Sequence, residues 1–139
     1  MDIVLVIPEG DASPVAVTGI TMVFDQANRI IGPRFNVRLA SHIPAKEVRL
    51  GRYSIQLDAR LQEINSADLI IIPPLNRQQK AGIAVNAPLI EWLKTMRQNS
   101  NSVLGSVCTG AYFLAATGLL DGKEASSHWA WIDELHGIF

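Results

Sequence analysis

The sequence of 139 residues lacks a second cysteine, a long hydrophobic run and an excess of either charge. Because Cys108 is its one cysteine, no internal disulfide can form, which excludes a secreted disulfide scaffold. No apolar run approaches the roughly 18 residues that a membrane-spanning helix needs. The first residues, Met1–Pro8, also lack the positive charges of a signal peptide. These absences predict a cytoplasmic protein without a membrane partner.

Neither charge sign dominates the chain, since 12 Lys and Arg stand against 13 Asp and Glu and the basic residues form no run. A domain that binds nucleic acid through its phosphates needs a basic excess on one face. The composition therefore argues against DNA binding by this domain. The histidines, His42, His128 and His136, show no metal-ligand spacing with cysteine or carboxylates, and the glycines form no phosphate-binding pattern. We expect no metal and no cofactor.

The apolar pattern is that of one α/β domain over residues 1–139, because short apolar runs alternate with helical patterns. Strands are predicted over Ile3–Ile7, Phe35–Ser41, Asp68–Pro73 and Ser102–Val107, with a hairpin over Val48–Leu50 and Ser54–Leu57 and a short strand over Glu124–Ser127. Helices are predicted over Val17–Ile31, Pro88–Asn99 and Ala111–Thr117, with another beginning at Ala130. The order of these elements predicts a mostly parallel sheet.

The segment Ser106–Gly110 has the pattern of a nucleophile on a sharp strand-to-helix turn, small-x-nucleophile-x-small, with Cys108 in the central position. The start of the following helix would favour a thiolate, and its backbone N–H groups could stabilise an oxyanion. The alternative is structural, because a free cysteine is often a small buried hydrophobic residue.

Three segments, Val107–Ala115, Gly118–Lys123 and Ala125–Trp129, closely resemble the amidotransferase-like domain of the ThiJ/PfpI superfamily. The nearest branch is the sensor domain that precedes AraC-type DNA-binding domains in transcriptional regulators. The resemblance implies a flavodoxin-like, doubly wound α/β fold with helices on both faces of the sheet. It also implies that the domain is incomplete at its C-terminal end and that a helix-turn-helix domain follows downstream, because relatives continue past the His-Trp motif.

The resemblance further implies that His128 approaches Cys108 and could orient or deprotonate the thiol. The alternative for His128 is packing against Trp129. Two departures from the family pattern weaken an enzymatic function. Ala16 stands where catalytic members carry an acid, and Pro74, which has no N–H, stands where they have a glycine that supplies an oxyanion donor. The N–H of the next residue, Leu75, could replace that donor.

We expect an unidentified small-molecule effector to bind at the carboxyl ends of the parallel strands, where open α/β sheets take their ligands. The residues predicted to line this pocket are Glu9, Asp11, Pro74, Leu75, Asn76, Cys108, Thr109 and His128. In a homodimer, the effector would control DNA binding by the downstream domain. Two alternatives stay open. One is a cysteine-dependent hydratase or amidase with Cys108 as nucleophile, and the other is a dimeric interaction module with a vestigial pocket.

Overall fold

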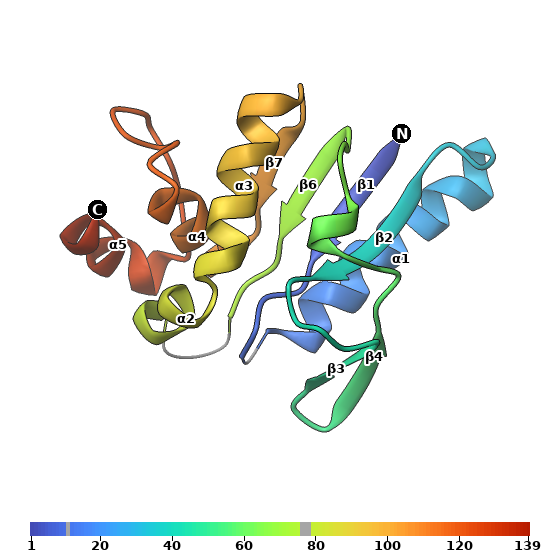
Figure 1. Ribbon diagram of the computed structural model, residues 1–139, viewed down its shortest axis with the longest axis horizontal. Helices are drawn as coiled ribbons and strands as arrows, with labels where there is room; N and C mark the ends of the chain where they lie inside the picture. The colour runs from blue at the N-terminus through green and yellow to red at the C-terminus, as the bar shows by residue number, and fades with distance from the viewer. Residues whose placement is uncertain (11, 76–78) are drawn as a thin grey trace.

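A five-stranded parallel sheet forms the centre of the computed structural model, which describes residues 1–10, 12–75 and 79–139 (Figure 1). The strand order is β5-β2-β1-β6-β7, and every neighbouring pair is parallel. The strands are β1 (Asp2–Val6), β2 (Asn36–Ser41), β5 (Ala59–Arg60), β6 (Leu69–Ile72) and β7 (Val103–Ser106). The predicted α/β fold class is confirmed.

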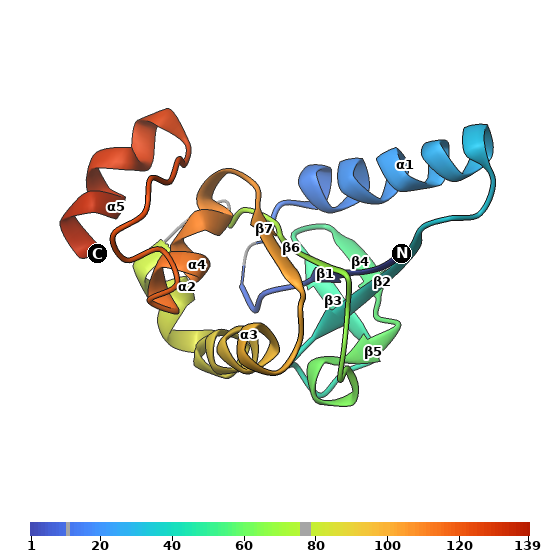
Figure 2. The same ribbon diagram turned by 90° about the horizontal axis from the view of Figure 1, so that it is seen from above.

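Two long helices cover opposite faces of the sheet, α1 (Pro14–Ile31) on one and α3 (Ala87–Asn99) on the other (Figure 2). The α1 helix begins three residues before the predicted Val17, because Ser13 caps it and Pro14 occupies its first turn. The Ser13 Oγ accepts a hydrogen bond from the Ala16 N–H at 3.4 Å. Gly32, with a φ of 84°, ends the helix.

The remaining elements are short. They are the helices α2 (Gln79–Val85), α4 (Ala111–Ala116) and α5 (Ile132–Ile138), the 3-10 turns η1 (Leu61–Glu63), η2 (Cys108–Gly110) and η3 (Trp129–Trp131), and the strands β3 (Glu47–Leu50) and β4 (Tyr53–Gln56). The predicted strand over Glu124–Ser127 is wrong, because that segment is irregular, mostly exposed and pairs with no strand of the described chain.

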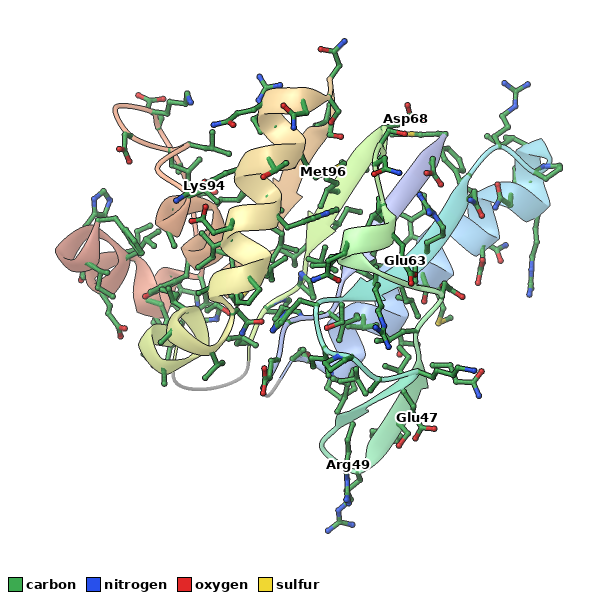
Figure 3. The ribbon with its side chains drawn as sticks, viewed as in Figure 1. Glu47, Arg49, Glu63, Asp68, Lys94 and Met96 are labelled. Carbon is green, nitrogen blue, oxygen red and sulfur yellow. The ribbon has the colours of Figure 1, made fainter. Side chains whose placement is uncertain are left out.

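The predicted hairpin is confirmed, and β3 and β4 pair antiparallel. Along β3, Val48 and Leu50 are buried while Glu47 and Arg49 are exposed, so the hairpin has one apolar face. Figure 3 shows the Arg49 side chain extending away from the rest of the molecule.

The core lies on both faces of β1, whose residues Ile3–Val6 are fully buried. This is why the strand is a continuous apolar run and does not alternate. A second, smaller cluster joins α4 to α5 through Tyr112, Ala115 and Leu135. Within the described ranges, no helix combines the length and the apolar composition that a bilayer crossing requires.

Candidate functional site

Cys108 lies on a sharp turn between β7 and α4, as the sequence pattern predicts. Val107 continues the ladder of β7, and its N–H donates to the Ile72 carbonyl at 2.9 Å. Cys108 then has a φ of 57°, the one positive φ of a non-glycine residue in the part of the chain that the structure describes. This left-handed conformation is strained for an L-residue, and such strained residues are common at functional sites. The backbone therefore presents the Cys108 side chain at the carboxyl edge of the sheet.

Gly110 allows the turn to be this tight. A Cβ atom built on Gly110 would lie 2.4 Å from the carbonyl oxygen of Ile72 and 3.1 Å from that of Pro73. Both atoms belong to backbone, so they cannot move aside as a flexible side chain would. The small residue two positions after the cysteine is therefore required by the close approach of α4 to the end of β6.

The loops at the carboxyl ends of β1, β6 and β7 are tied to one another. The buried Thr109 hydroxyl donates to the Leu75 carbonyl at 2.9 Å. The Ser13 N–H donates to the Pro74 carbonyl at 3.0 Å, and Ala12 forms an antiparallel bridge with Leu75. The structure thus gathers four of the predicted pocket residues, Pro74, Leu75, Cys108 and Thr109, around the turn.

The segment that carries His128 lies against the same turn. The Ser127 hydroxyl donates to the Cys108 carbonyl at 3.1 Å. The His128 ring stacks on Trp129, with ring centroids 5.4 Å apart, and its Nδ1 accepts from the Ala130 N–H at 3.1 Å. A neutral imidazole that accepts through Nδ1 carries its proton on Nε2. The Nδ1 lone pair of His128 is therefore engaged by the backbone of its own 3-10 turn.

Two further features could activate the Cys108 thiol: an acid in the first turn of α1 and the dipole of the helix that follows the turn. Ala16 lies in the first turn of α1, where it presents a methyl group in place of an acid. The helix behind Cys108, α4, is six residues long and follows a 3-10 turn, so few aligned peptide dipoles point at the sulfur. Among the residues that the structure describes, the turn thus has Ala16 at the position of the acid and a His128 Nδ1 that is already hydrogen-bonded.

Asn86 fixes the loop after β1, and sequence analysis did not single it out. Its side chain is fully buried between α2 and α3. Its Oδ1 accepts from the Glu9 N–H at 2.7 Å, and its Nδ2 donates to the carbonyls of Glu9 at 2.9 Å and Gly82 at 2.8 Å. Because Glu9 lies 77 positions away from Asn86 in the sequence, no local pattern could have indicated this role.

The carboxylate of Glu9 is paired with a histidine. Its Oε2 lies 3.5 Å from Nε2 of His42, which directly follows β2. The His42 side chain is 8% exposed, and its Nδ1 is buried without a partner among the described residues. The other two predicted pocket residues, Asp11 and Asn76, lie outside the described residues.

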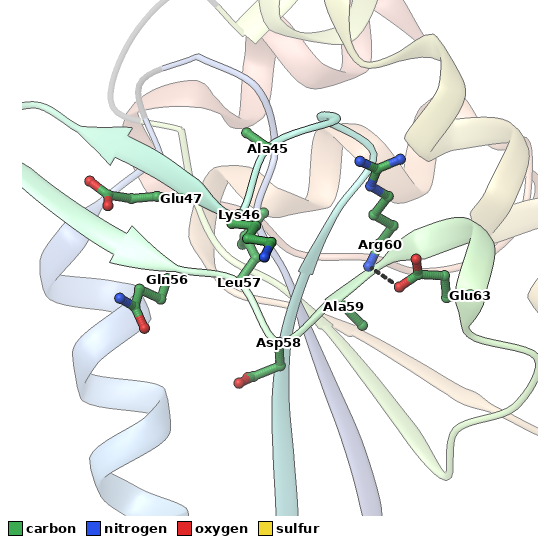
Figure 4. Close-up of a pocket in the computed structure, with 9 residues that line it drawn as sticks. All are labelled: Ala45, Lys46, Glu47, Gln56, Leu57, Asp58, Ala59, Arg60 and Glu63. Atoms are coloured by element: carbon green, nitrogen blue, oxygen red, sulfur yellow. Dashed lines mark hydrogen bonds between the residues drawn. The ribbon is translucent and has the colours of Figure 1, made fainter.

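A separate polar hollow lies at the opposite edge of the sheet, beside β5 (Figure 4). Its volume is about 460 Å³, and its charged lining side chains are Lys46, Glu47, Asp58, Arg60 and Glu63. Glu63 Oε2 accepts from the Arg60 N–H at 3.0 Å. These side chains are exposed and include both signs, so the hollow has no preference for one ligand charge. Within the described ranges, no three His, Cys, Asp or Glu residues are placed to hold a metal ion.

Comparisons with known proteins agree with this geometry. A model of the DJ-1/PfpI family matches residues 4–138. The HTH-type transcriptional regulator CdhR of Pseudomonas aeruginosa is 34% identical over 84 residues, which cover 58% of this chain and 23% of the regulator. An isonitrile hydratase of Pseudomonas putida is 60% identical over 30 residues, which cover 22% of this chain and 13% of the hydratase. Each match thus spans less than a quarter of the relative's own length.

Solved structures share the fold at low sequence identity. Oxidized DJ-1 of Toxoplasma gondii superposes with a TM-score of 0.75 at 20% identity, covering 96% of this chain and 70% of that one. An AraC family transcriptional regulator from Pseudomonas putida gives 0.70 at 19% identity, covering 98% and 71%. A ThiJ/PfpI family protein from Pseudomonas syringae gives 0.78 at 21% identity, covering 98% and 53%.

Proposed function

This chain belongs to the DJ-1/PfpI family, and we propose that it is the effector-sensing domain of an AraC-type transcriptional regulator. In the described residues, Ala16 replaces the family's acid and the His128 Nδ1 accepts from Ala130, which supports a sensor over an enzyme. The observation that carries the proposal is the 34% identity to the regulator CdhR over 84 residues, a longer match than that to the hydratase. The AraC family regulator among the solved structures supports it at the level of the fold.

In this function, a small effector binds at the carboxyl ends of β1, β6 and β7. The groups available to it are the Cys108 thiol, the Thr109 backbone and the His128 ring, with Glu9 on the neighbouring loop. Binding favours one of two states of a homodimer, and attached DNA-binding domains read out the difference. A helix-turn-helix domain outside this chain would make the DNA contacts, in keeping with a net charge of −1 on the chain itself.

Sequencing the coding region that follows the codon for Phe139 tests the proposal directly. We expect the natural coding sequence to continue past the codon for Phe139 into a pair of helices with helix-turn-helix spacing. A stop codon shortly after Phe139, with no such region, would contradict the regulator function.

The second candidate is a cysteine-dependent enzyme, favoured by the strained φ of 57° at Cys108 and by the short match to isonitrile hydratase. In that case Cys108 attacks the substrate carbon, and backbone N–H groups stabilise the charge that develops.

Alkylation of Cys108 by iodoacetamide at pH 7 separates the two candidates. With Ala16 in place of an acid and His128 Nδ1 engaged by Ala130, we expect a rate no more than a few times that of free cysteine. The Cys108→Ser variant supplies the background rate, because it removes the chain's one thiol. A rate about 100-fold above free cysteine would support the enzyme and count against the sensor.

A further inference from the structure

His42 is a buried titratable residue that the proposed function does not use. It directly follows β2, and its side chain is 8% exposed. Its Nδ1 is buried without a partner among the described residues, while its Nε2 faces the Glu9 carboxylate at 3.5 Å. An unperturbed imidazole changes its charge between about pH 5 and 8. A proton on His42 therefore turns a contact between a neutral ring and a carboxylate into an ion pair.

The loop that joins β1 to α1 is anchored at both of its ends. At the start of the loop, the Ser41 hydroxyl donates to the Ile7 carbonyl at 2.7 Å in a buried position. At the far end, Ala12 bridges to Leu75 at the end of β6. Movement of this loop is therefore confined to the residues between these anchors.

Glu9 lies between the anchors and is held there by two side chains. Asn86 binds its N–H at 2.7 Å and its carbonyl at 2.9 Å, and His42 binds its carboxylate. The Glu9 side chain is 53% exposed, so its carboxylate can leave His42 for water without opening the core. The next residue, Gly10, has a φ of 109° and no atom within 4 Å of the position a Cβ would take. The backbone after Glu9 thus has open space in which to move.

Glu9 is the nearest charge to His42 in the part of the chain that the structure describes. The charged residues on the segments beside His42 are Glu9, Lys46, Asp58, Arg60 and Glu63. Only the Glu9 carboxylate forms an ion pair with the ring. Asp58 and Glu63 instead accept from backbone N–H groups at 2.7 and 3.0 Å, and the two cations line the polar hollow beside β5. Asp11, on the same loop as Glu9, lies outside the described residues.

We propose that His42 and Glu9 form a proton-sensitive latch, which holds the loop between β1 and α1 closed at mildly acidic pH and loosens it above neutral pH. The loop borders the carboxyl ends of the parallel strands, so the latch ties access to that edge of the sheet to the pH. The latch is a property of the free chain and does not depend on the sensor function.

The direction of the effect follows from the surroundings of the ring. Burial opposes a charge on His42, and the Glu9 carboxylate offsets this cost only while the loop is closed. A proton on His42 and the closed loop therefore favour each other by the same factor. Closure is strongest where His42 is protonated and Glu9 is ionised, and it weakens as the pH rises and the imidazole loses its proton.

Hydrogen exchange at the Glu9 amide, followed by NMR on the full chain without ligand, tests the latch. This N–H donates to the Asn86 Oδ1, so it exchanges when the loop opens. After correction for the intrinsic pH dependence of exchange, its protection factor should fall about tenfold between pH 5.5 and pH 8, a coupling of ordinary size. A wild-type protection factor that does not change with pH would overturn the proposal.

Three variants assign the effect to the pair. Glu9→Gln removes the charge from an exposed side chain, and His42→Gln removes the titrating group, so both should abolish the pH dependence of the protection factor. His136→Gln, on an exposed residue of α5, is the matched control and should retain it. If the buried variant His42→Gln does not fold, Glu9→Gln alone decides. A Glu9→Gln protein with the wild-type pH dependence would refute the latch.

The imidazole ring provides a second measurement that does not depend on exchange. In an NMR titration, His42 should lose its proton at a lower pH in Glu9→Gln than in the wild type, because the variant lacks the carboxylate. An identical titration in the two proteins would contradict the pairing. Since no ligand is present in either experiment, the latch can fail while the sensor function stands, and the coding sequence after Phe139 tests that function separately.

Discussion

At Gly110, the backbone of one element touches the backbone of another without room for a methyl group. The residue has ordinary helical dihedral angles, with a φ of −57°. It is therefore required for space and not for conformational freedom. The start of α4 depends on it, because the Ile72 carbonyl lies 2.4 Å from where a Cβ would stand.

Gly110→Ala should lower the free energy of unfolding by about 3 kcal/mol, since overpacking against rigid backbone typically costs 1–3 kcal/mol or more. Urea unfolding measures this loss. The control is Gly137→Ala in α5, where nothing lies within 4 Å of the added methyl group. The control should lose no stability, because alanine favours a helix over glycine. A Gly110→Ala protein as stable as the control would show that α4 can shift away from β6 freely.

The residues around Cys108 were predictable because they are contiguous. The strand, the small residues and the helix stand within one short segment, and the structure has them in that order. The pairing of Glu9 with His42 and the role of Asn86 were not predictable, because each depends on where separate strands end. The sequence also did not predict that the His128 Nδ1 accepts a hydrogen bond from the Ala130 N–H and so caps η3.

Among the elements, the helices α2 and α3 and the loop after β1 are held together by one side chain, that of Asn86. Asn86 makes three hydrogen bonds in a site without solvent. Without the Asn86 side chain, the part-buried N–H and carbonyl of Glu9 would lose this partner, while the Gly82 carbonyl would keep the Asn86 N–H at 3.2 Å. A polar group left unpaired away from water costs about 1–3 kcal/mol.

Asn86→Ala should therefore destabilise the protein by about 3 kcal/mol in urea unfolding. It should also speed hydrogen exchange at the Glu9 amide, which donates to the Asn86 side chain. Asn99→Ala, at the exposed end of α3, is the matched control and should change stability by less than about 0.5 kcal/mol. Unchanged exchange at Glu9 would contradict the role given to Asn86.

The elements with strong periodicity were predictable and the shortest ones were not. The continuous run of β1 and the alternation of β3 indicate strands because burial on two faces or one sets those patterns. By contrast, β5 has two residues and exists through its pairing with the end of β2. The predicted strand over Glu124–Ser127 failed for the same reason, since a short segment forms a strand only where a neighbour offers a free edge.

At the scale of the whole molecule, the small cluster between α4 and α5 holds the C-terminal helix to the rest. Tyr112 contributes most to it, being 1% exposed and donating its hydroxyl proton to the Trp131 carbonyl at 2.9 Å. Burial, with a smaller effect from the carboxylate of Glu134, raises the pKa of Tyr112 above its ordinary value of 10.0.

This shift predicts a loss of stability in alkali. Below pH 10, Tyr112 is protonated in both states and its contribution is complete. Above pH 10, the unfolded chain releases the proton while the native protein retains it, so stability falls as the pH rises through the raised folded-state pKa. Urea unfolding between pH 8 and 12 measures the slope.

Tyr112→Phe should show a smaller fall over that range, because phenylalanine has no proton to lose. Tyr53→Phe, on the exposed hairpin, is the control and should retain the slope of the wild type. Identical slopes for all three proteins would show that Tyr112 titrates alike in the folded and unfolded states.

The hydrogen bonds that join Ser13 to Pro74 and Thr109 to Leu75 also limit the rate at which a ligand could bind there. A molecule that enters between the ends of β1 and β6 must wait for these bonds to break, because the donors and acceptors there are already paired. Its observed association rate would then level off at high concentration, at the opening rate of the loops, instead of rising in proportion. For the proposed sensor function, the response time would then be set by the opening of these loops and not by diffusion of the ligand.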